Sequence, residues 1–402
     1  MRILHAVKTV DGARWALDQV RELVARGFEV HVVLPALSGR FIAAWRETGA
    51  VLHAMPVDVP VKCIWRLPEM LQQIRRLVEQ VKPDIIHSHF FGTTVMLRMA
   101  LGRDHPTPRI FQVPGPLHLE HALFRRWELR TAGPADLWIA SSRYIESLYT
   151  SHGVAQDRVF LSYYGNQWVS PPLMADKQQQ GQWRQRLSIP SNQWVVGNIN
   201  HIYPPKWYLG QSRGLKRHED VIDALALVCQ TRDDVTGVLV GSQWGGGDGY
   251  QKSLARRAAS AGAGRILMPG HLASEEVSAA WKDFDLAVHV PSSENCGGVV
   301  EPLQAGVPVI AARVGGLPEV VFDGVTGQLV SPGDVEALAR AISGALNQLG
   351  MMREGAVRGA ALVTTMFDVA RTAKEVADVY DHVSSGAPRP RHFDSRAFVA
   401  SL

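Results

Sequence analysis

The chain has 402 residues, which exceeds the roughly 100–200 residues of an ordinary domain and predicts two domains. Its hydrophobic residues (46%) and charged residues (20%) exclude an intrinsically disordered chain, and its three cysteines exclude a disulfide framework. The net charge is only +4 and no dense basic helix is present, which argues against binding of nucleic acid.

The first half alternates short apolar runs with helical patterns, which predicts parallel strands joined by helices. A helix is expected over 15–27 because Gly27 ends its pattern, and another over 67–83 because Pro68 begins it and Pro83 ends it. The expected strands are 2–7, 28–35, 49–57, 84–90, 109–114 and 136–142. This half is therefore predicted to be a doubly wound α/β sheet.

The polar segment Ala175–Gln193 interrupts the alternation, so we expect one domain over 1–175 and a second doubly wound domain over 176–379. The strands expected in the second are 194–199, 236–241, 265–270, 286–292, 308–312 and 327–331, with helices near 182–187, 218–229, 250–262, 273–281, 299–305, 334–347 and 368–382. The Arg/Pro-rich stretch 387–393 is expected to be extended or loosely held. A final helical segment, about 380–402, is expected to pack back on the first domain.

Charge is unevenly divided along the chain. Residues 1–190 carry 23 Lys and Arg against 16 Asp and Glu, a balance of +7, whereas residues 191–402 carry 19 against 22, a balance of −3. Scatter of surface charge explains this as well as a first half that meets an anionic partner, such as a phosphorylated acceptor or a membrane surface. No apolar run reaches the roughly 18 residues of a membrane span, and no signal-peptide pattern is present, so we expect a soluble, cytoplasmic protein.

The stretch 291–318 (PSSENCGGVVEPLQAGVPVIAARVGGLP) combines glycines with polar residues. An expected strand leads into Glu294 and Asn295, then into the Gly297–Gly298 turn, and then into a helix that bears Glu301. Free backbone N–H groups at that turn would form an anion site suited to a diphosphate. A second turn of this kind, GGLPE, follows. Either turn alone is typical of an ordinary βα connection, but both in order, with two carboxylates, indicate a ligand site.

The order of these motifs resembles the donor-binding signature of the retaining GT-B glycosyltransferases of family 4, in the variant S-E-N-x-G-G-x-x-E. Earlier segments are similar to the same family: residues 9–35 resemble its opening Gly loop, helix and second strand, and DIIHSHF resembles the end of its D-x-x-H-x-H strand. The resemblance implies a GT-B fold of two Rossmann-like domains facing a central cleft. It also implies that the N-terminal domain binds the acceptor, that the C-terminal domain binds a nucleotide-sugar donor, and that no metal or other cofactor is needed.

By this resemblance, Glu301 matches the second Glu of the family's paired-glutamate motif, which binds the donor ribose. The position of the first Glu, eight residues earlier, is occupied by Ser293, and Glu294 lies seven residues earlier. Either Glu294 takes that role in a loop one residue shorter, or Glu294 and Asn295 contact the sugar in an altered way. Gly297 and Gly298 match the glycines that face the diphosphate and the donor sugar.

The basic residues of the implied donor site follow the family less closely. Lys216 matches the Lys that neutralises the leaving diphosphate, because LKRHEDVIDAL is similar to the family's K-G-x-x-x-L-I-x-A segment. Asn198 stands where the family has an Arg, so Arg213 or Lys206, from an inserted loop, is expected to supply that charge. Positive groups lower the barrier there because negative charge develops on the diphosphate. The remaining donor-binding candidates are Gly12, Gly241 and Val299.

Two further signals are weaker. Asp283 and Asp285 match the D-x-D metal motif of a different transferase fold, but they directly precede a strand, so we expect local pairing and no metal site. On the acceptor side, Gln112 stands where many family members have a His, which leaves His118 as the candidate for contact with the reacting sugar or acceptor. A surface or capping role suits His118 nearly as well.

The helix after His118 carries Arg125 and Arg126 beside two aromatic residues. These arginines either face an anionic acceptor or a membrane surface, or belong to a solvated helix face.

The expected function is retaining transfer of a sugar from a nucleotide-diphosphate donor, preferably a UDP-linked hexose or N-acetylhexosamine, to a hydroxyl acceptor in bacterial glycan or natural-product synthesis. The acceptor is phosphorylated or lipid-linked in the version that the charge balance favours, with the enzyme at the inner face of the membrane. Two alternatives remain open. One is another sugar-nucleotide enzyme on this fold, such as an epimerase or hydrolase, and the other is a weakly catalytic nucleotide-sugar-binding partner protein.

Overall fold

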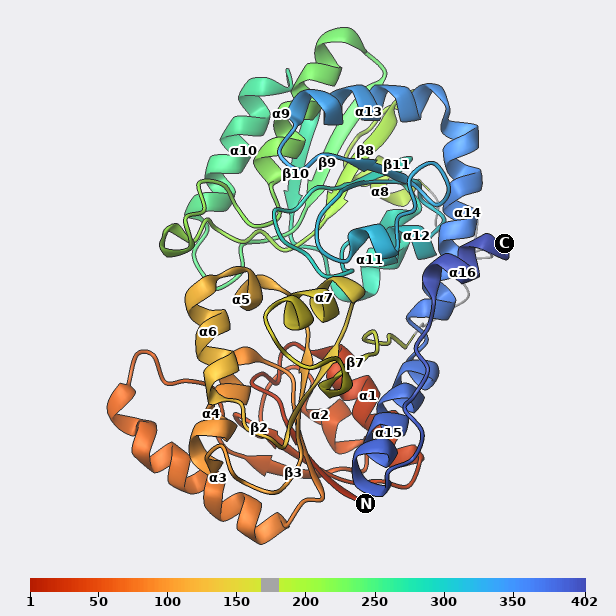
Figure 1. Cartoon of the computed structure of the whole chain (residues 1–402). Coiled ribbons are helices and arrows are strands. Elements are labelled where there is room, and N and C mark those ends of the chain that lie inside the picture. The colour runs from red at the N-terminus through yellow and green to blue at the C-terminus, as the bar shows by residue number, and fades with distance from the viewer. Residues whose placement is uncertain (168–180) are drawn as a thin grey trace. The chain divides into compact units, whose positions relative to one another are not determined.

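The structure is a computed structural model that describes residues 1–167 and 181–402, and the chain divides into two compact units (Figure 1). Unit 1 comprises Met1–Trp168 together with Met366–Asp394, and unit 2 comprises Val169–Thr365 together with Ser395–Leu402. The domain boundary expected at 175/176 lies outside the described residues. The part of the chain that returns to unit 1 is Met366–Asp394. The final segment expected to pack on the first domain, about 380–402, therefore does so only as far as Asp394, because Ser395–Leu402 belongs to unit 2.

Unit 1 is built on a seven-stranded parallel sheet with the order β3-β2-β1-β4-β5-β6-β7. Its strands are β1 (Arg2–Ala6), β2 (Glu29–Leu34), β3 (Val51–Ala54), β4 (Ile85–Ser88), β5 (Arg109–Val113), β6 (Asp136–Ala140) and β7 (Val159–Leu161). Its longer and shorter helices are α1 (Arg14–Ala25), α2 (Ile42–Arg46), α3 (Leu67–Val81), α4 (Phe91–Leu101), α5 (Leu117–Glu120), α6 (Ala122–Thr131), α7 (Arg143–Ser151) and α15 (Val369–Ser385).

Helices cover both faces of this sheet. Neighbouring residues of a strand point to opposite faces, so Ile3 joins a core with α1 and α15, whereas Leu4 joins a second core with α3 and α4. A parallel sheet buried on both faces needs apolar residues at nearly every strand position, which is why these strands are continuous apolar runs in the sequence.

Unit 2 repeats this plan with a six-stranded parallel sheet of the order β10-β9-β8-β11-β12-β13 (Figure 1). Its strands are β8 (Trp194–Ile199), β9 (Val235–Val240), β10 (Ile266–Gly270), β11 (Leu286–His289), β12 (Val309–Ala312) and β13 (Gln328–Val330). Its helices are α8 (Gln182–Arg186), α9 (His218–Thr231), α10 (Gly249–Ala261), α11 (Ser274–Trp281), α12 (Val300–Gln304), α13 (Val335–Asn347), α14 (Leu349–Met366) and α16 (Ser395–Ala400). The two doubly wound sheets predicted from the sequence are confirmed.

The carboxyl ends of β8 and β11 lie side by side at the centre of the second sheet. The chain builds the sheet outward in one direction from β8 and in the other direction from β11, so the two connecting segments diverge at this point. Ligands of open α/β sheets bind where the strand order reverses in this way. A ligand site in unit 2 is therefore expected at the loops that follow β8 and β11.

One alternative expected for the C-terminal part of the chain is not met, and one helix was not predicted. The stretch 387–393 has no helix or strand, but it is not loosely held, because the Arg389 guanidinium donates hydrogen bonds to the carbonyls of Gln156, Asp157 and Val159. The helix α14 was not expected, since its glycines are poor helix formers. One of them, Gly359, is needed for packing: a Cβ there would lie 2.6 Å from a methyl carbon of Leu303 on α12.

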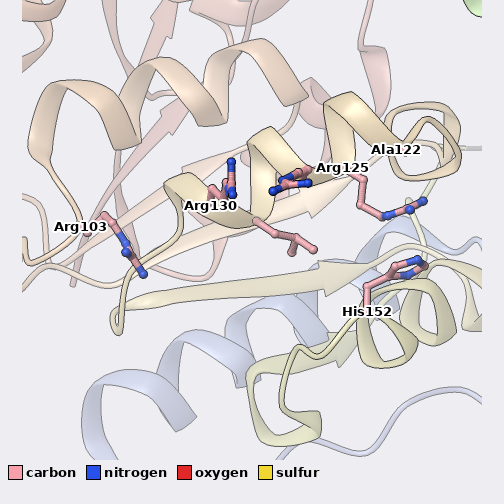
Figure 2. A pocket seen from close by; sticks show the side chains of 7 residues that line it. Arg103, Ala122, Arg125, Arg130 and His152 are labelled. Carbon is pink, nitrogen blue, oxygen red and sulfur yellow. The ribbon is translucent and has the colours of Figure 1, made fainter.

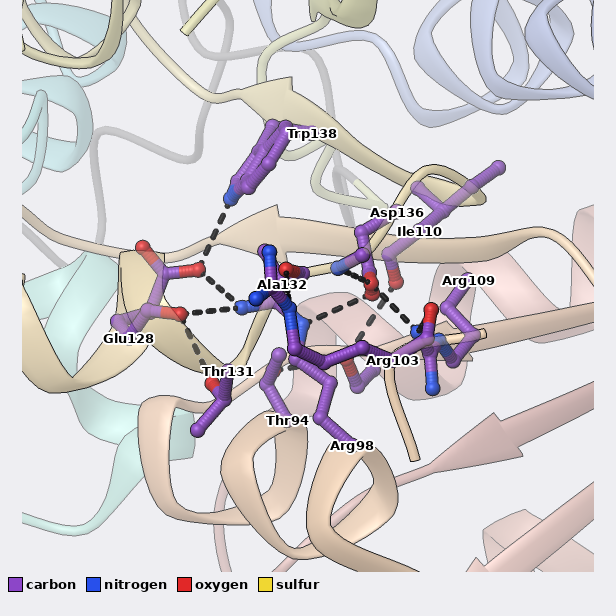
Figure 3. A network of polar contacts seen from close by, with 12 residues as sticks. Thr94, Arg98, Arg103, Arg109, Ile110, Glu128, Thr131, Ala132, Asp136 and Trp138 are labelled. Atoms are coloured by element: carbon purple, nitrogen blue, oxygen red, sulfur yellow. Dashed lines mark hydrogen bonds and ion pairs between the residues drawn. The ribbon is translucent and has the colours of Figure 1, made fainter. Parts of the chain in front are cut away.

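A buried ionic network holds α6 against the first sheet (Figure 3). The Arg98 guanidinium, 2% exposed, pairs with Glu128 of α6 at 2.5 Å and with Asp136 of β6 at 2.8 Å. Asp136 also pairs with Arg109 at 2.6 Å, and Trp138 donates its indole N–H to Glu128 at 3.0 Å. Buried charges are tolerated because each has a close partner of opposite sign.

Candidate functional site

Three charged and polar side chains meet at the carboxyl end of β11: Lys216 from the segment before α9, His289 from the end of β11, and Glu294 from the loop after it. The Lys216 ammonium donates a hydrogen bond to Oε2 of Glu294, and His289 Nε2 donates to the same oxygen at 3.1 Å. Lys216 and Glu294 are largely buried, with 15% and 13% of their side chains exposed, and His289 is 2% exposed. A charged pair is thus kept almost out of water at the carboxyl end of β11.

The electrostatics of this cluster favour an ionised carboxylate. Burial alone would raise the pKa of Glu294, but the positive charge of Lys216 and the hydrogen bond from His289 outweigh burial and hold that pKa well below its ordinary value. Burial lowers the pKa of His289, against the hydrogen bond to Glu294. The cluster therefore contains a carboxylate, an ammonium and a neutral imidazole near neutral pH.

Two glycine turns pack directly on this cluster. Gly298 has φ +76°, and a Cβ there would lie 2.2 Å from a ring carbon of His289. Gly315 has φ +56°, and a Cβ there would lie 1.7 Å from the carbonyl oxygen of Glu294. Both positions require glycine, for a left-handed backbone and for close approach. The two turns that the sequence marked out therefore meet at one place, beside Glu294.

The remaining donor-binding candidates lie around these turns. Glu301 is exposed on the first turn of the five-residue α12, and Val299 is buried just before that helix. The Asn295 backbone N–H donates to Oε1 of Glu294 at 3.1 Å, so Asn295 is held against the cluster. Of the two residues considered for the first carboxylate, only Glu294 has a carboxyl group, and Ser293 is buried beside it.

Three candidates from other loops of unit 2 differ in how they are engaged. Gly241 follows β9 with φ +149° and packs on the carbonyl of Asn200. Arg213 pairs with Asp220 and, at 3.2 Å, with Asp223, so its charge is already neutralised within the α9 region. The Lys206 backbone N–H donates to Gln211, and Lys206 forms no ion pair with any carboxylate over the described residues.

Asn198, which occupies the position of the family's arginine, does not lie in the loop after the first strand of unit 2. Asn198 lies inside β8 and is 2% exposed, so its side chain is part of the sheet interior and not of a loop after the strand. Asn200, two residues later, lies beyond the strand end, where its amide donates to Nδ1 of His289 at 3.4 Å. The first residue of the β8 loop to reach the cluster is therefore an amide and carries no charge.

Three residues of this site were missed at the sequence level: His289, Asn200 and His218. His218 is 1% exposed at the start of α9, neither ring nitrogen has a hydrogen-bond partner over the described residues, and burial with the charge of Lys216 lowers its pKa to about 3. His289 could have been suspected, since it is the one polar residue in the apolar run LAVHV that leads into the motif. Asn200 and His218 had no such signal.

The aspartates of the D-x-D match are engaged within the fold, but their partners are distant in the sequence and not local as predicted. Asp283 accepts hydrogen bonds from the backbone N–H groups of Gly181 (2.5 Å) and Trp183 (2.7 Å) at the start of α8. Asp285 pairs with Arg184 and Arg353. Over residues 1–167 and 181–402, no group of three or more His, Cys, Asp and Glu side chains has an arrangement able to hold a metal ion.

In unit 1, His118 lies in the four-residue α5 that follows β5. Its ring packs against Phe91 and Phe111, with centroid distances of 5.4 and 5.6 Å, and its Nε2 has no hydrogen-bond partner in the described part of the chain. Burial, with a smaller effect of the Arg98 charge, lowers the pKa of His118 to about 3. His118 is thus a neutral ring with one unused nitrogen.

A buried network of histidines and tyrosines lies behind the strand ends of unit 1. His5 Nδ1 is hydrogen bonded to His89 Nε2 at 3.0 Å, and His87 Nδ1 to the Tyr380 hydroxyl at 2.5 Å. The Tyr380 hydroxyl also lies 3.2 Å from His5 Nε2. The three imidazoles are stacked and completely buried, and burial lowers the pKa of His5 to about 3. These three histidines are therefore part of the packed interior of unit 1.

The other sequence candidates of unit 1 are Gly12, Arg125 and Arg126. Gly12 belongs to the loop between β1 and α1, where the neighbouring Asp11 carboxylate accepts from the Arg40 backbone N–H at 2.6 Å. Arg125 and Arg126 lie on α6, whose one acidic residue, Glu128, points into the ionic network.

None of the helices over the described residues is both long and apolar enough to cross a bilayer.

Family models and relatives match both units. The model described as glycosyl transferases group 1 matches residues 196–355, and the model described as Glycosyltransferase Family 4 matches residues 12–165. The D-inositol 3-phosphate glycosyltransferase of Mycobacterium marinum is 37% identical over 357 residues, which cover 83% of this chain and 72% of that protein. The protein of the same name from Salinispora tropica is 33% identical over 204 residues, 49% of this chain, and the match spans only 40% of that relative's length.

Among solved structures, the Anabaena protein HepE in complex with UDP-glucose matches with a TM-score of 0.77 at 23% identity, over 94% of this chain and 99% of that chain. Sucrose-phosphate synthase from Thermosynechococcus elongatus matches with a TM-score of 0.72 at 17% identity, over 96% of this chain and 100% of that chain. At these identities the likeness shows a shared fold.

Proposed function

The chain belongs to the group 1 glycosyl transferases, and we propose that it transfers a sugar from a nucleotide-diphosphate donor to a hydroxyl acceptor. Its two Rossmann-like sheets have the GT-B fold. The observation that carries the proposal is the Lys216–Glu294–His289 cluster beneath the two glycine turns of unit 2. This cluster lies at the point of the sheet where open α/β folds bind ligands.

In the proposed donor complex, the diphosphate lies against the Gly297–Gly298 turn, where no side chain keeps it from the backbone. Lys216 has three N–H donors, so it can keep its hydrogen bond to Glu294 and still donate to a phosphate oxygen. Negative charge develops on the diphosphate as the sugar–phosphate bond breaks, and a fixed ammonium stabilises it without reorganisation. Glu294 and His289 hold that ammonium in place, and Glu301 accepts hydrogen bonds from the ribose.

We further propose that transfer retains the anomeric configuration and requires no metal ion. With no protein nucleophile assigned, the leaving phosphate itself accepts the acceptor's proton as the new bond forms on the same face. The protein then supplies orientation and charge stabilisation. A UDP-linked hexose or N-acetylhexosamine is the proposed donor, supported by the UDP-glucose bound to the similarly folded Anabaena protein.

We assign the acceptor to unit 1. Its His118 has a buried Nε2 without a hydrogen-bond partner among the described residues, next to the carboxyl end of β5, and its sequence carries most of the positive charge. Two of the relatives bear the name D-inositol 3-phosphate glycosyltransferase, which supports an acceptor with a phosphate group. A cytoplasmic enzyme acting on a phosphorylated or lipid-linked acceptor at the inner face of the membrane is consistent with this charge.

The donor proposal is tested by thermal unfolding with UDP, GDP, ADP and dTDP, each alone. A nucleotide present at about 100 times its Kd stabilises the folded chain by about 2.7 kcal/mol, which raises the melting temperature measurably. The variant Glu301→Ala is the matched control. Without nucleotide it should melt at the same temperature as the wild type, and added nucleotide should not raise that temperature. If none of the four nucleotides raises the melting temperature of the wild type, the donor site is wrong.

The reaction is tested with the sugar nucleotide that binds best and a panel of hydroxyl acceptors, with products identified by mass spectrometry and the anomeric configuration by NMR. Glycosides that form only with an acceptor and without added metal support the proposal. Release of nucleotide without any glycoside would instead assign the chain to the hydrolases or epimerases of this fold, and binding without turnover would make it a binding protein.

A further inference from the structure

Unit 1 contains a pocket of about 520 Å³ that runs along α6 (Figure 2). Its walls carry four arginines and a histidine: Arg103, Arg125, Arg126, Arg130 and His152. Among the described residues that line it, none is acidic. A volume of this size is ordinary for a small-molecule site, for which about 300–1,000 Å³ is typical. The pocket combines this size with four arginines and, among the described residues that line it, no acidic side chain.

The positive wall is a consequence of how α6 is held. Glu128 is the one acidic residue of α6, and the ionic network turns it inward, where it pairs with Arg98 and accepts from the Trp138 indole (Figure 3). The side of α6 that faces the pocket therefore keeps Arg126 and Arg130 without a compensating carboxylate from the same helix. Because Glu128 is buried in the ionic network, the positive charge on the pocket side of α6 is not neutralised by this helix.

The guanidinium groups of the pocket keep N–H donors that are available to a ligand. Arg103 donates to the carbonyl of Ala132 at 2.9 Å and Arg125 to the carbonyl of Leu119 at 2.6 Å, each through one of its N–H groups. None of the four arginines forms an ion pair with a carboxylate over the described residues. Because a guanidinium carries five N–H donors in a planar fork, these side chains match the oxygens of phosphate groups.

Two walls of the pocket come from the ends of helices that lead back to the amino ends of strands. Arg103 follows α4 after Gly102 and leads toward β5, and His152 directly follows α7 and leads toward β7. Substrates of open α/β sheets bind at the carboxyl ends of the strands, where His118 lies. Arg103 and His152 thus belong to a different part of unit 1 from the acceptor site assigned above.

We propose that this pocket binds a soluble molecule with two or more phosphate groups, at a site separate from those of the sugar transfer. Four guanidinium groups around one concave space require a ligand of several negative charges, and bidentate contacts to phosphate oxygens satisfy both the charge and the planar geometry of the forks. A lipid surface is the competing occupant, since Leu123 (66% exposed) and Trp127 (36% exposed) lie on the same helix. Neither of them lines the pocket, and a concave wall favours a small solute.

The test is isothermal titration calorimetry with inorganic tripolyphosphate, in the presence of excess UDP to occupy any diphosphate site in unit 2. The wild type should bind one tripolyphosphate per chain, with an affinity that falls as salt is raised. The double variant Arg126→Gln/Arg130→Gln should bind at least about tenfold more weakly, because it loses two charge-assisted contacts. Both variant positions are exposed, so the melting temperature should stay that of the wild type.

The matched control is Arg66→Gln/Arg76→Gln, which removes the same charge from exposed positions of unit 1 outside the pocket. It should bind tripolyphosphate as the wild type does. A parallel arm measures sedimentation with phosphatidylglycerol vesicles. The proposal is overturned if the wild type shows no saturable binding, if both double variants lose it equally, or if the pocket variant loses vesicle binding while tripolyphosphate does not bind at all.

Discussion

Gly315 and Glu294 are in direct contact, such that a Cβ built on Gly315 would lie 1.7 Å from the Glu294 carbonyl oxygen. The second glycine turn of unit 2 therefore supports the backbone of the residue whose carboxylate pairs with Lys216. A contact this close leaves no room for any side chain, so the turn and the ion pair have to change together.

The variant Gly315→Ala should lose nucleotide binding and stability together. It adds the cost of a left-handed backbone, about 1–2 kcal/mol, to an overlap that only a shift of the Glu294 loop relieves. Gly324→Ala is the matched control, because Gly324 has φ +73° but nothing within 4 Å of its Cβ position. Gly324→Ala should cost only the backbone term and bind nucleotide normally. Equal nucleotide affinity in the two variants would show that the contact with Glu294 is unimportant.

Lys216→Ala and Glu301→Ala should separate turnover from binding. Loss of the Lys216 ammonium removes stabilisation of the charge that develops on the leaving diphosphate, so kcat should fall by roughly 10²–10³-fold. Glu301→Ala should mainly raise the Kd for nucleotide, measured by calorimetry. Lys216→Arg, which keeps the charge, should recover part of kcat. A kcat for Lys216→Ala close to that of the wild type would remove Lys216 from the assigned role.

Arg98→Met should destabilise unit 1 strongly. It leaves the buried carboxylates of Glu128 and Asp136 without their shared partner, and breaking a buried pair in this way costs about 3–5 kcal/mol. Arg340→Met is the control, since Arg340 and Glu336 form an exposed pair 3.8 Å apart, and it should change the free energy of unfolding by less than about 0.5 kcal/mol. Urea denaturation measures both, and similar values for the two variants would mean that the network is dispensable.

Unit 1 should lose stability as the pH falls below about 6.5. Burial lowers the pKa of His5 to about 3, so the unfolded chain binds a proton that the folded chain refuses between those two pH values. The stability from the neutral His5 is complete above the unfolded pKa and decreases by roughly 1.4 kcal/mol for each pH unit below it. His87 and His89, whose pKa values burial also lowers, add to this slope.

The measurement is the free energy of unfolding of unit 1 between pH 7.5 and pH 4.5, followed by chemical denaturation. His5→Gln should be less stable at pH 7.5 and show a shallower slope with pH. His152→Gln, at an exposed position, is the control and should keep the wild-type slope. A wild-type stability that does not change across this range would contradict the burial of neutral histidines.

The sequence predicted the fold well where one pattern dominated. Pro68 at its start and Pro83 just beyond its end predicted α3 nearly to its ends, and the structure buries its residues at helical spacing, Met70, Ile74, Val78 and Val81. The helix α14 escaped prediction because Gly350, Gly355 and Gly359 lower its helix propensity. Close packing on α12 through Gly359 outweighs that cost, and such a tertiary contact leaves no local signal.

The candidate site was predictable in its backbone and less so in its side-chain pairings. The order of the motif placed Gly297–Gly298, Glu294 and Lys216 in one site, and the structure brings Lys216 to Glu294. The neutralisation of Arg213 by Asp220 and Asp223 depends on how the loop enters α9, which no spacing rule describes. His289 was not predicted as a site residue, because one polar residue in an apolar run still indicates only a strand.

The position of Tyr380 in the histidine network affects the order in which unit 1 can be completed during synthesis of the protein. Unit 1 takes its helix α15 from residues that follow almost all of unit 2, so the first sheet leaves the ribosome long before Tyr380 does. Until then, His5 and His87 lack their shared hydroxyl partner, and the face of α1 that packs on α15 stays open to solvent. Residues 169–365, by contrast, emerge as one uninterrupted stretch. Unit 1 is therefore begun first but completed only after nearly all of unit 2 has been made, and unit 2 in turn receives its last helix, α16, from the end of the chain.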